Sequence, residues 1–209
     1  PWIGDFSWLL LTPVTEEISN PDIFHRQSSY RPNESIFQPH YLKIQSNRYQ
    51  ICTELTPTTY GACLRMTSQR SQAIRLIFHS KASCHFRKLD SHTIIGSLSE
   101  ETCLTKLPLT MHICLRFNHP IQSHHFLEED FVINFEQSQL QFSLATSFIS
   151  EEQAIDNLPR EDFDSIKEQT KLAWESYLHR FDVVHQGVAD RRMFDHSLYR
   201  LFLPKPFMS

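Results

Sequence analysis

The chain has 209 residues, enough for one large domain with an appendage, and 40% of them are hydrophobic, including 16 Phe. A chain of this length and apolar content can bury a substantial core, so its composition excludes an intrinsically disordered protein. The 20 Lys and Arg oppose 24 Asp and Glu, which gives a formal net charge of −4, and no polybasic block occurs. This balance predicts neither nucleic acid nor an anionic membrane surface as a partner.

Glycine is scarce: the chain has only four, at positions 4, 61, 96 and 187. Glycine-rich phosphate loops, dinucleotide-binding turns and the G-x-S-x-G nucleophile elbow all require glycines close together. The wide spacing therefore excludes these three kinds of site. We expect the turns to be built from Asn, Ser, Asp and Pro instead.

The five cysteines, at positions 52, 63, 84, 103 and 114, form no C-x-x-C pair and are odd in number. They therefore predict free thiols that act as small apolar residues, and a reducing, cytoplasmic compartment. The longest apolar run, Trp8 to Leu11, is far too short to span a membrane, and no basic and apolar leader opens the chain. We expect neither membrane insertion nor export.

From Trp8 to about Phe148 apolar residues recur with a period of two, which predicts strands with one buried face. The clearest example runs from Leu107 to Phe117. Short polar turns around Ser46-Asn47 and Gln137-Ser138 predict antiparallel hairpins. About ten strands are expected, in the runs 8–14, 41–44, 49–55, 62–66, 73–78, 92–98, 107–117, 131–135 and 140–148. The predicted fold is mainly β with C-terminal α, a large antiparallel β-sandwich over residues 1–149, with a barrel as the alternative.

The period changes at residue 150. Ser150 and Gln153 form a capping-box sequence, in which the Ser oxygen accepts a backbone N–H and the Gln side chain reaches back to another. This predicts a short helix that ends before Pro159. The next apolar residues, from Phe163 to Phe181, recur at steps of three and four and predict an amphipathic helix of about five turns.

A last helix is expected near the C-terminal end of the chain, after a turn at Gly187. Asp190 is predicted to cap this helix, and its apolar face runs from Phe194 to Phe202. Residues 150–209 are therefore predicted to form a helical linker.

The best local candidate for a metal site is a polar segment between two predicted strands. Its spacing fits no zinc template, so we interpret it as a polar hairpin loop and predict no metal there. No nucleophile and no acid and base pair can be named either, because the adjacent glutamates of the chain fall where loop charges are expected. The polar segment considered for a metal contains His119, His124, His125, Glu128, Glu129 and Asp130.

The first residues of the chain offer a candidate binding site of another kind, because Trp2 and Trp8 flank Asp5 directly before the first predicted strand. A tryptophan face beside a carboxylate can hold a pyranose, with the sugar's apolar face on the ring and its hydroxyls on the acid. Trp2 and Asp5 are thus candidate substrate-binding residues. The alternative is that both tryptophans simply fill the core or its end.

Six segments spread along the chain form a recognisable series. They are GDFSWLLLTPVT at 4–15, YRPNESIFQPHY at 30–41, ELTPTTYG at 54–61, ATSFISEEQAIDNL at 145–158, WESYLHRF at 174–181 and FDHSLYRLFLP at 194–204. In order and spacing these segments resemble the motifs of glycoside hydrolase family 92, the calcium-dependent exo-α-mannosidases. The departures are Arg31, where the family often has His, and Pro39-His40 in place of Pro-Gly.

The resemblance implies a two-part enzyme: a galactose-mutarotase-like sandwich, a helical linker and a C-terminal (α/α)6 barrel. In the family the catalytic acid, the catalytic base and the calcium ligands lie in the barrel, and hydrolysis inverts the anomeric centre. We therefore expect this chain to be the non-catalytic sandwich and linker of an α-1,2-mannosidase, inactive alone, with no cofactor of its own and calcium only in the barrel.

The partners implied are a mannose-containing oligosaccharide, the absent catalytic barrel and, through exposed helix faces, a second copy of the chain. The helix from Phe163 to Phe181 is expected to dock the barrel. The resemblance favours Trp2 and Asp5 as substrate contacts and assigns Trp8 to packing. The rival hypothesis is a stand-alone carbohydrate-binding β-sandwich without hydrolase activity. A mutarotase would need a histidine and a carboxylate facing one carbon, and the sequence places no such pair.

Overall fold

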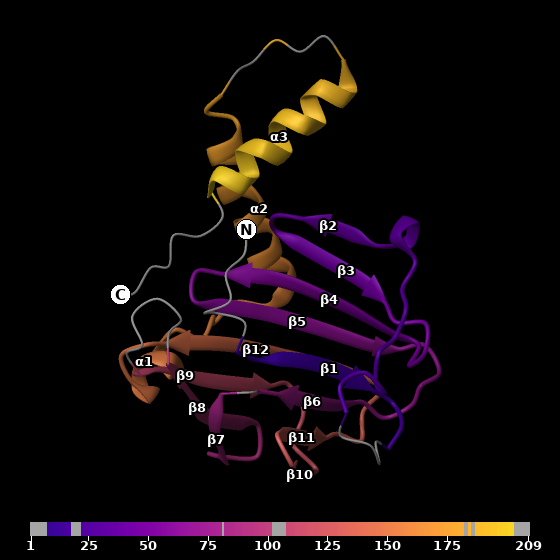
Figure 1. The fold of residues 1–209 in the computed structure, drawn as a ribbon, viewed down its shortest axis with the longest axis vertical. Helices are drawn as coiled ribbons and strands as arrows, with labels where there is room; N and C mark the ends of the chain where they lie inside the picture. The colour runs from indigo at the N-terminus through magenta and orange to yellow at the C-terminus, as the bar shows by residue number, and fades with distance from the viewer. Residues whose placement is uncertain are drawn as a thin grey trace.

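Two antiparallel sheets make up most of the computed structural model (Figure 1), which describes residues 8–17, 22–80, 82–101, 108–181, 184 and 187–202. The smaller sheet has four strands in the order β1-β6-β11-β10, and the larger has eight in the order β2-β3-β4-β5-β12-β9-β8-β7. The strands are β1 Leu10–Val14, β2 Ile36–Gln38, β3 Tyr41–Gln45, β4 Ile51–Thr58, β5 Gly61–Ser68, β6 Arg75–His79, β7 Ser83–Lys88, β8 Thr93–Glu101, β9 Pro108–Phe117, β10 Ser123–Leu127, β11 Asp130–Asn134 and β12 Gln139–Ser147. The prediction of a large antiparallel sandwich followed by helices is confirmed.

The core lies between the two sheets, as the period of two predicts. In β9, Ile113 and Leu115 point into this core, and Cys114 between them is buried on the opposite face of the sheet. The two sheets meet through aromatic rings: Phe86 of β7 stacks on Phe131 of β11 with 4.8 Å between ring centroids. Along a strand, every second side chain therefore faces the core between the two sheets.

Three strands were missed by the sequence prediction, and all three lie at sheet edges. β2 and β7 close the two ends of the larger sheet, and β10 closes one end of the smaller. An edge strand has only one neighbour and carries more exposed polar residues, so its apolar alternation is weak. All three residues of β2 are exposed, and so are the first four of β10. The loop expected from His119 to Asp130 thus contains a strand.

The two predicted hairpin turns have different outcomes. The turn after Ser46 is confirmed, because β3 and β4 pair and the Ser46 N–H donates to the Ile51 carbonyl at 2.9 Å. The hairpin at Gln137-Ser138 is wrong, because β11 belongs to the smaller sheet and β12 to the larger. Phe135 explains the difference: its ring is buried against Phe117, so the chain crosses the core there instead of reversing.

The scarcity of glycine has a consequence in the turns. Among the described residues, three other than glycine adopt positive φ angles, namely Gln50 at 53°, Ser71 at 55° and Glu128 at 53°. Glu128 begins the reversal between β10 and β11. Of these three, only Ser71 is of a type expected in turns from the composition. The left-handed region is sterically unfavourable for residues with a Cβ, so these turns hold local strain.

Helix α1 (Glu151–Asp156) packs on the outer face of the larger sheet, where Ala154 and Leu158 contact Ile95, Cys114 and Ala145. Half of the predicted capping box is confirmed. The Ser150 hydroxyl oxygen accepts the Gln153 N–H at 3.1 Å, but the Gln153 side chain donates forward to Asn157 Oδ1 at 3.0 Å. The helix ends before Pro159, as predicted.

Two longer helices follow, α2 (Phe163–Leu178) and α3 (Val188–Phe202), and a 3₁₀ turn, η2 (Pro32–Glu34), precedes β2. Asp190 does not cap α3, because the helix begins earlier: the Gly187 carbonyl already accepts the Arg191 N–H at 3.2 Å. In the part of the chain that the structure describes, no helix combines the length and the apolar character needed to cross a membrane. The domain division between residues 149 and 150 stays a prediction.

Four cysteines lie among the described residues, and each is a free thiol: Cys52, Cys63, Cys84 and Cys114. Burial raises the pKa of the Cys114 thiol to about 11, which keeps it protonated at neutral pH. Their interpretation as small apolar residues fits this burial. Cys103 lies outside the described residues.

Candidate functional site at the foot of helix α2

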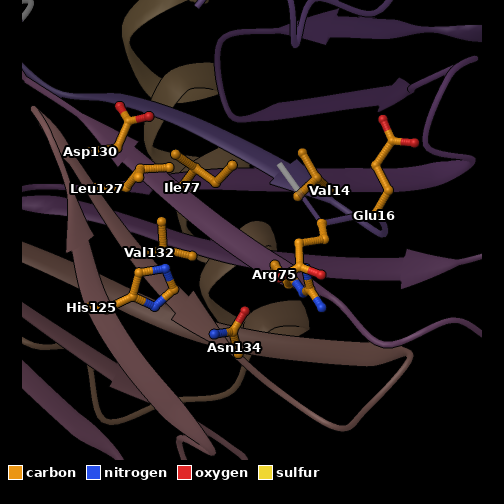
Figure 2. Close-up of a pocket in the computed structure, with 10 residues that line it drawn as sticks. Val14, Glu16, Arg75, Ile77, His125, Leu127, Asp130, Val132 and Asn134 are labelled. Atoms are coloured by element: carbon orange, nitrogen blue, oxygen red, sulfur yellow. The ribbon is translucent and has the colours of Figure 1, made fainter. Parts of the chain in front are cut away.

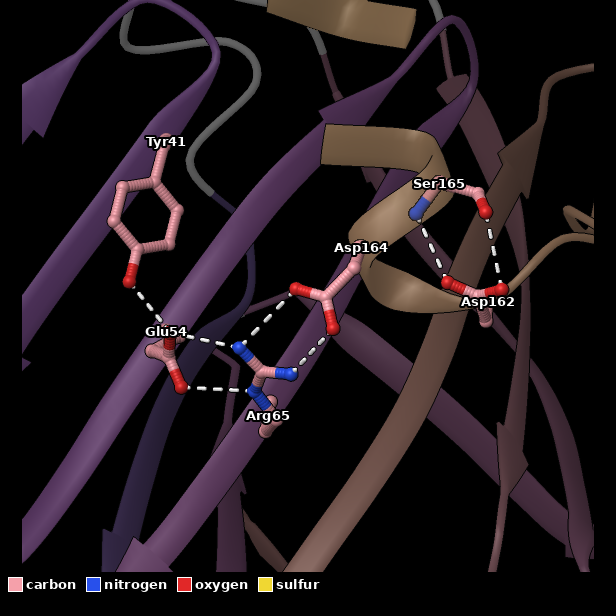
Figure 3. Close-up of polar contacts among 6 residues, drawn as sticks. All are labelled: Tyr41, Glu54, Arg65, Asp162, Asp164 and Ser165. Atoms are coloured by element: carbon pink, nitrogen blue, oxygen red, sulfur yellow. Dashed lines mark hydrogen bonds and ion pairs between the residues drawn. The ribbon is translucent and has the colours of Figure 1, made fainter. Parts of the chain in front are cut away.

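A polar network joins helix α2 to the outer face of the larger sheet (Figure 3). Glu54 of β4 and Arg65 of β5 lie opposite each other in the strand register. Arg65 Nε donates to Glu54 Oε2 at 2.8 Å, and Arg65 Nη2 donates to Oε1 at 3.0 Å. The same guanidinium donates to Asp164 Oδ2 in the first turn of α2 at 3.1 Å. One arginine therefore bridges two strands and the helix.

Aromatic rings complete the network. The Tyr41 hydroxyl donates to Glu54 Oε1, and the Lys167 ammonium lies 3.5 Å from the centre of the Tyr41 ring. The Arg65 guanidinium lies over the Phe163 ring, 4.4 Å from its centroid. Both cations thus contact an aromatic face, and Arg65 also makes ion pairs.

The pKa values of two members of this network, Glu54 and Tyr41, are shifted away from neutral pH. The hydrogen bonds from Arg65 hold the pKa of the Glu54 carboxyl below its ordinary value of 4.5. Burial, together with the bond to Glu54, raises the pKa of Tyr41. General acid or base catalysis needs a group whose pKa lies near the working pH, so these groups fix a helix and are not suited to move protons.

The foot of α2, from Phe163 to Thr170, is attached by further contacts. Asp162 caps the helix: its Oδ1 accepts the Ser165 N–H at 2.9 Å. Phe163 and Ile166 are buried with Tyr41 and Cys63, and the Thr170 hydroxyl donates to the Pro57 carbonyl at 3.0 Å. Phe163 is only 1% exposed because it packs on its own sheet, and the expectation that the helix from Phe163 to Phe181 docks a barrel stays a prediction.

Beyond Thr170 the helical segment borders the sandwich only at its edge, where Leu178 and Tyr199 line a pocket with Phe37. Figure 1 shows most of α3 extending away from the two sheets, and α2 and α3 hold each other through aromatic pairs. Trp174 packs on Tyr199 at 5.3 Å and Tyr177 on Phe202 at 5.6 Å between ring centroids. Many apolar side chains here are exposed, which is the pattern of a surface that meets a partner. They are Leu172, Tyr177, Phe181, Val184, Val188, Met193, Leu201 and Phe202.

The smaller sheet has its own polar cluster, which the sequence did not predict. Arg26, from the segment that covers this sheet, is 2% exposed and pairs with Asp130 at the start of β11; Nη2 donates to Oδ1 at 2.9 Å. His79 of β6 contacts the same carboxylate at 2.8 Å through Nδ1. The residues are 104 and 51 positions from Asp130 in the sequence, so only the fold brings them together.

The candidate residues from the sequence have separate outcomes. Trp2 and Asp5 lie outside the described residues, so their role as substrate contacts stays a prediction. Trp8 is 5% exposed and meets Phe148 edge to face at 6.4 Å, which confirms its assignment to packing. Among the residues that the structure describes, no three His, Cys, Asp or Glu side chains gather in a way that could hold a metal ion.

The comparison with family models and the comparison with solved structures agree with each other. No curated protein matches the sequence. A GH92 α-mannosidase from Bacteroides thetaiotaomicron has a TM-score of 0.81 at 15% identity; the match covers 93% of this chain and 31% of that one. A GH92 inverting mannosidase from B. thetaiotaomicron VPI-5482 has a TM-score of 0.78 at 17% identity, covering 92% and 29%.

A more distant structure, a putative kojibiose phosphorylase from the human microbiome, has a TM-score of 0.53 at 12% identity and covers 77% of this chain and 26% of that one. The chain spans about a third of the length of the mannosidases that it matches. These likenesses show the fold. The model of the glycosyl hydrolase family 92 N-terminal domain matches residues 1–156, so the chain belongs to this family of N-terminal domains.

Proposed function

We propose that the chain is the non-catalytic sandwich portion of an α-1,2-mannosidase, which docks a catalytic (α/α)6 barrel and contributes to mannoside binding. The family match and the mannosidase folds support this proposal. So does the complex of one such mannosidase with mannoimidazole, a ligand of that protein. In the proposal, Trp2 and Asp5 contact the mannoside.

One observation carries the docking part: the helical segment is fixed at one end and apolar at the other. Its foot is attached through Arg65 and Phe163, while Met193 is 67% exposed and Leu201 80% exposed. Exposed apolar side chains gain free energy when another surface covers them, about 25 cal/mol for each Å². A rigid foot also lowers the entropy that docking would cost.

The assignment of the chain as non-catalytic is supported by the chemistry of the polar network at the foot of α2. Glu54, Tyr41 and Arg65 satisfy one another and are fixed in their charge states, so none is available to protonate a leaving group or to activate water. Inverting hydrolysis would need two carboxyl groups separated by room for a water molecule. In the proposal, the barrel supplies these groups.

Calcium also belongs to the barrel in this proposal. The described part of this chain offers no cluster of carboxylates for the ion, so no step is assigned to calcium here. The free thiols at the four described cysteines support the further proposal of a reducing, cytoplasmic compartment.

The rival function is a stand-alone carbohydrate-binding module. Titration of the isolated chain with mannose, followed by tryptophan fluorescence, separates the two. The proposal expects no saturable change and no mannoside hydrolysis from the chain alone. Saturable quenching that disappears in Trp2→Ala would favour the rival, and hydrolysis by the isolated chain would overturn both.

Docking is tested by mixing the chain with a separately purified family 92 barrel and measuring complex formation by light scattering. Met193→Glu should weaken the complex about tenfold, because a charge would be buried at the contact. The matched control is Leu89→Glu, which changes an exposed apolar residue of the β7–β8 turn. Equal effects of both substitutions would contradict docking through α3.

A further inference from the structure

The outer face of the smaller sheet holds a cavity of about 100 Å³ (Figure 2). Val14, Ile77 and Val132 give it an apolar lining, and Arg75 and His125 lie at its polar side. Asn134, which also lines it, is the register partner of Arg75, and His125 is the register partner of Val132. Three hydrogen-bonding side chains from three adjacent strands, β6, β11 and β10, therefore border one small space.

Arg75 is unusual among the arginines of the described residues. It is half-buried, yet it has neither a carboxylate nor an aromatic ring as a partner. Every other described arginine is either paired in this way or exposed to solvent. The fork of N–H groups at Arg75 has no carboxylate partner among the described residues and lies at the cavity, so it is open to an acceptor from outside the chain.

The acidic residues around the cavity are mostly neutralised by other cations. Glu16 pairs with Arg48 at 2.7 Å, and Asp130 pairs with Arg26 and His79. Only Glu17 lines the cavity without a cation beside it, and its side chain is exposed. The cation that remains for a ligand is Arg75.

The size and the lining of the cavity select the ligand. About 100 Å³ corresponds to the share of roughly three water molecules, which suits a carboxylate group that carries one or two aliphatic carbons and is small for a hexose. Planar carboxylates match the guanidinium fork in a bidentate manner, and Ile77 and Val132 suit an aliphatic carbon. We propose that Arg75, His125 and Asn134 form a binding site for a small organic carboxylate. This site lies on the opposite sheet from α2 and does not depend on the function proposed above.

The test is a titration of the ¹⁵N-labelled chain with sodium propionate at constant ionic strength, followed by NMR. Saturable shifts are expected at the amides of β6, β11 and β10. Arg75→Met should weaken binding about tenfold or more, since it removes a charged hydrogen bond, and Arg75→Lys should weaken it less. Arg70→Met is the matched control, because Arg70 is exposed, and it should bind as the parent chain does. The same spectra report whether each variant is folded.

Two further arms test the chemistry of the ligand. Glu17→Gln should tighten propionate binding, because it removes the uncompensated negative charge at the cavity. Weaker binding in this variant would overturn the assignment to a carboxylate. Inorganic phosphate should bind less well than propionate, since it places no carbon on the apolar lining. Absence of saturable shifts with propionate, or equal affinity in Arg75→Met, would overturn the site itself.

Discussion

The sandwich and the helical segment beyond Thr170 treat apolar side chains in opposite ways. Within the sandwich, the large apolar residues that face between the two sheets are mostly buried, and even a charged pair, Arg26 with Asp130, is withdrawn from water. In the helical segment, Leu198 is the only buried residue of α3 in the part that the structure describes. Residues 172–202 supply eight of the seventeen exposed large apolar side chains that are described.

This difference shows which part of the chain is complete on its own. The two sheets bury each other's apolar surface, since each covers the apolar face of the other. The helical segment packs on a sheet at its foot, where Phe163 and Ile166 meet Tyr41, and many of its apolar side chains beyond the foot stay exposed. Substitutions in the sandwich should therefore change the stability of the fold, whereas substitutions in α3 should change association.

The largest effect is expected from breaking the buried ion pair of the smaller sheet. Arg26→Met leaves the Asp130 carboxylate buried with only His79 beside it, which should lower the free energy of unfolding by about 3–5 kcal/mol. Urea denaturation measures this change. The control is Arg31→Met: its pair with Glu34 is exposed, with side chains 66% and 53% accessible, so the loss should be below about 0.5 kcal/mol. Equal losses would show that the Arg26 pair is not effectively buried.

A smaller effect is expected from filling the close approach of β5 and β12. A Cβ on Gly61 would lie 1.9 Å from the Leu144 carbonyl oxygen, so Gly61→Ala must push two strands apart. Overpacking of this kind costs about 1–3 kcal/mol. A Cβ on Gly187 would meet nothing within 4 Å, so Gly187→Ala is the matched control in the helical segment. Thermal unfolding should show a lower Tm for the first variant and little change for the second.

The sequence predicts much of this sandwich because its signals are local. Alternation in β9 and the Ser150 cap each depend on neighbours in the chain, and both are confirmed in the structure. The ion pairs are not local: Arg65 meets Asp164 across 99 positions and Arg26 meets Asp130 across 104. No pattern in one sequence marks such partners.

The predictions at the sheet edges and at the crossing between the sheets failed for related reasons. β10 was hidden by its polar composition, and the crossing at Gln137 resembled a hairpin because only the buried Phe135 ring distinguishes the two. The cavity beside Arg75 was missed as well, because its lining comes from four strands of the smaller sheet and the segment after β1. The proposed substrate contacts, Trp2 and Asp5, lie outside the described residues and stay predictions.

The polar network at the foot of α2, which includes Glu54 and Arg65, should make the free energy of unfolding depend on pH. The pKa of Glu54 is lowered in the folded chain, so its contribution to stability is present above about pH 4.5 and is lost as the pH falls through its folded pKa. Arg65→Met should remove about 1–2 kcal/mol at neutral pH, since its charged hydrogen bonds are partly exposed to solvent. The variant should also flatten the decline in acid. Urea midpoints from neutral pH to pH 3 measure both, and an unchanged acid slope would contradict the role of this pair.

The smallest effect on folding and the clearest effect on association are expected in α3. Leu201 is 80% exposed, so Leu201→Glu should change the free energy of unfolding by less than about 0.5 kcal/mol. If the exposed face of the helical segment pairs with a second copy of the chain, the same substitution should weaken dimerisation about tenfold, because a charge would then be desolvated at the contact. Light scattering across a dilution series measures this, with Leu89→Glu as the control in the sandwich. A monomeric parent chain that binds no apolar dye would remove the second copy as a partner. In that case the apolar face of α3 would not drive self-association, and any contact with a barrel would depend on a complementary surface on the barrel.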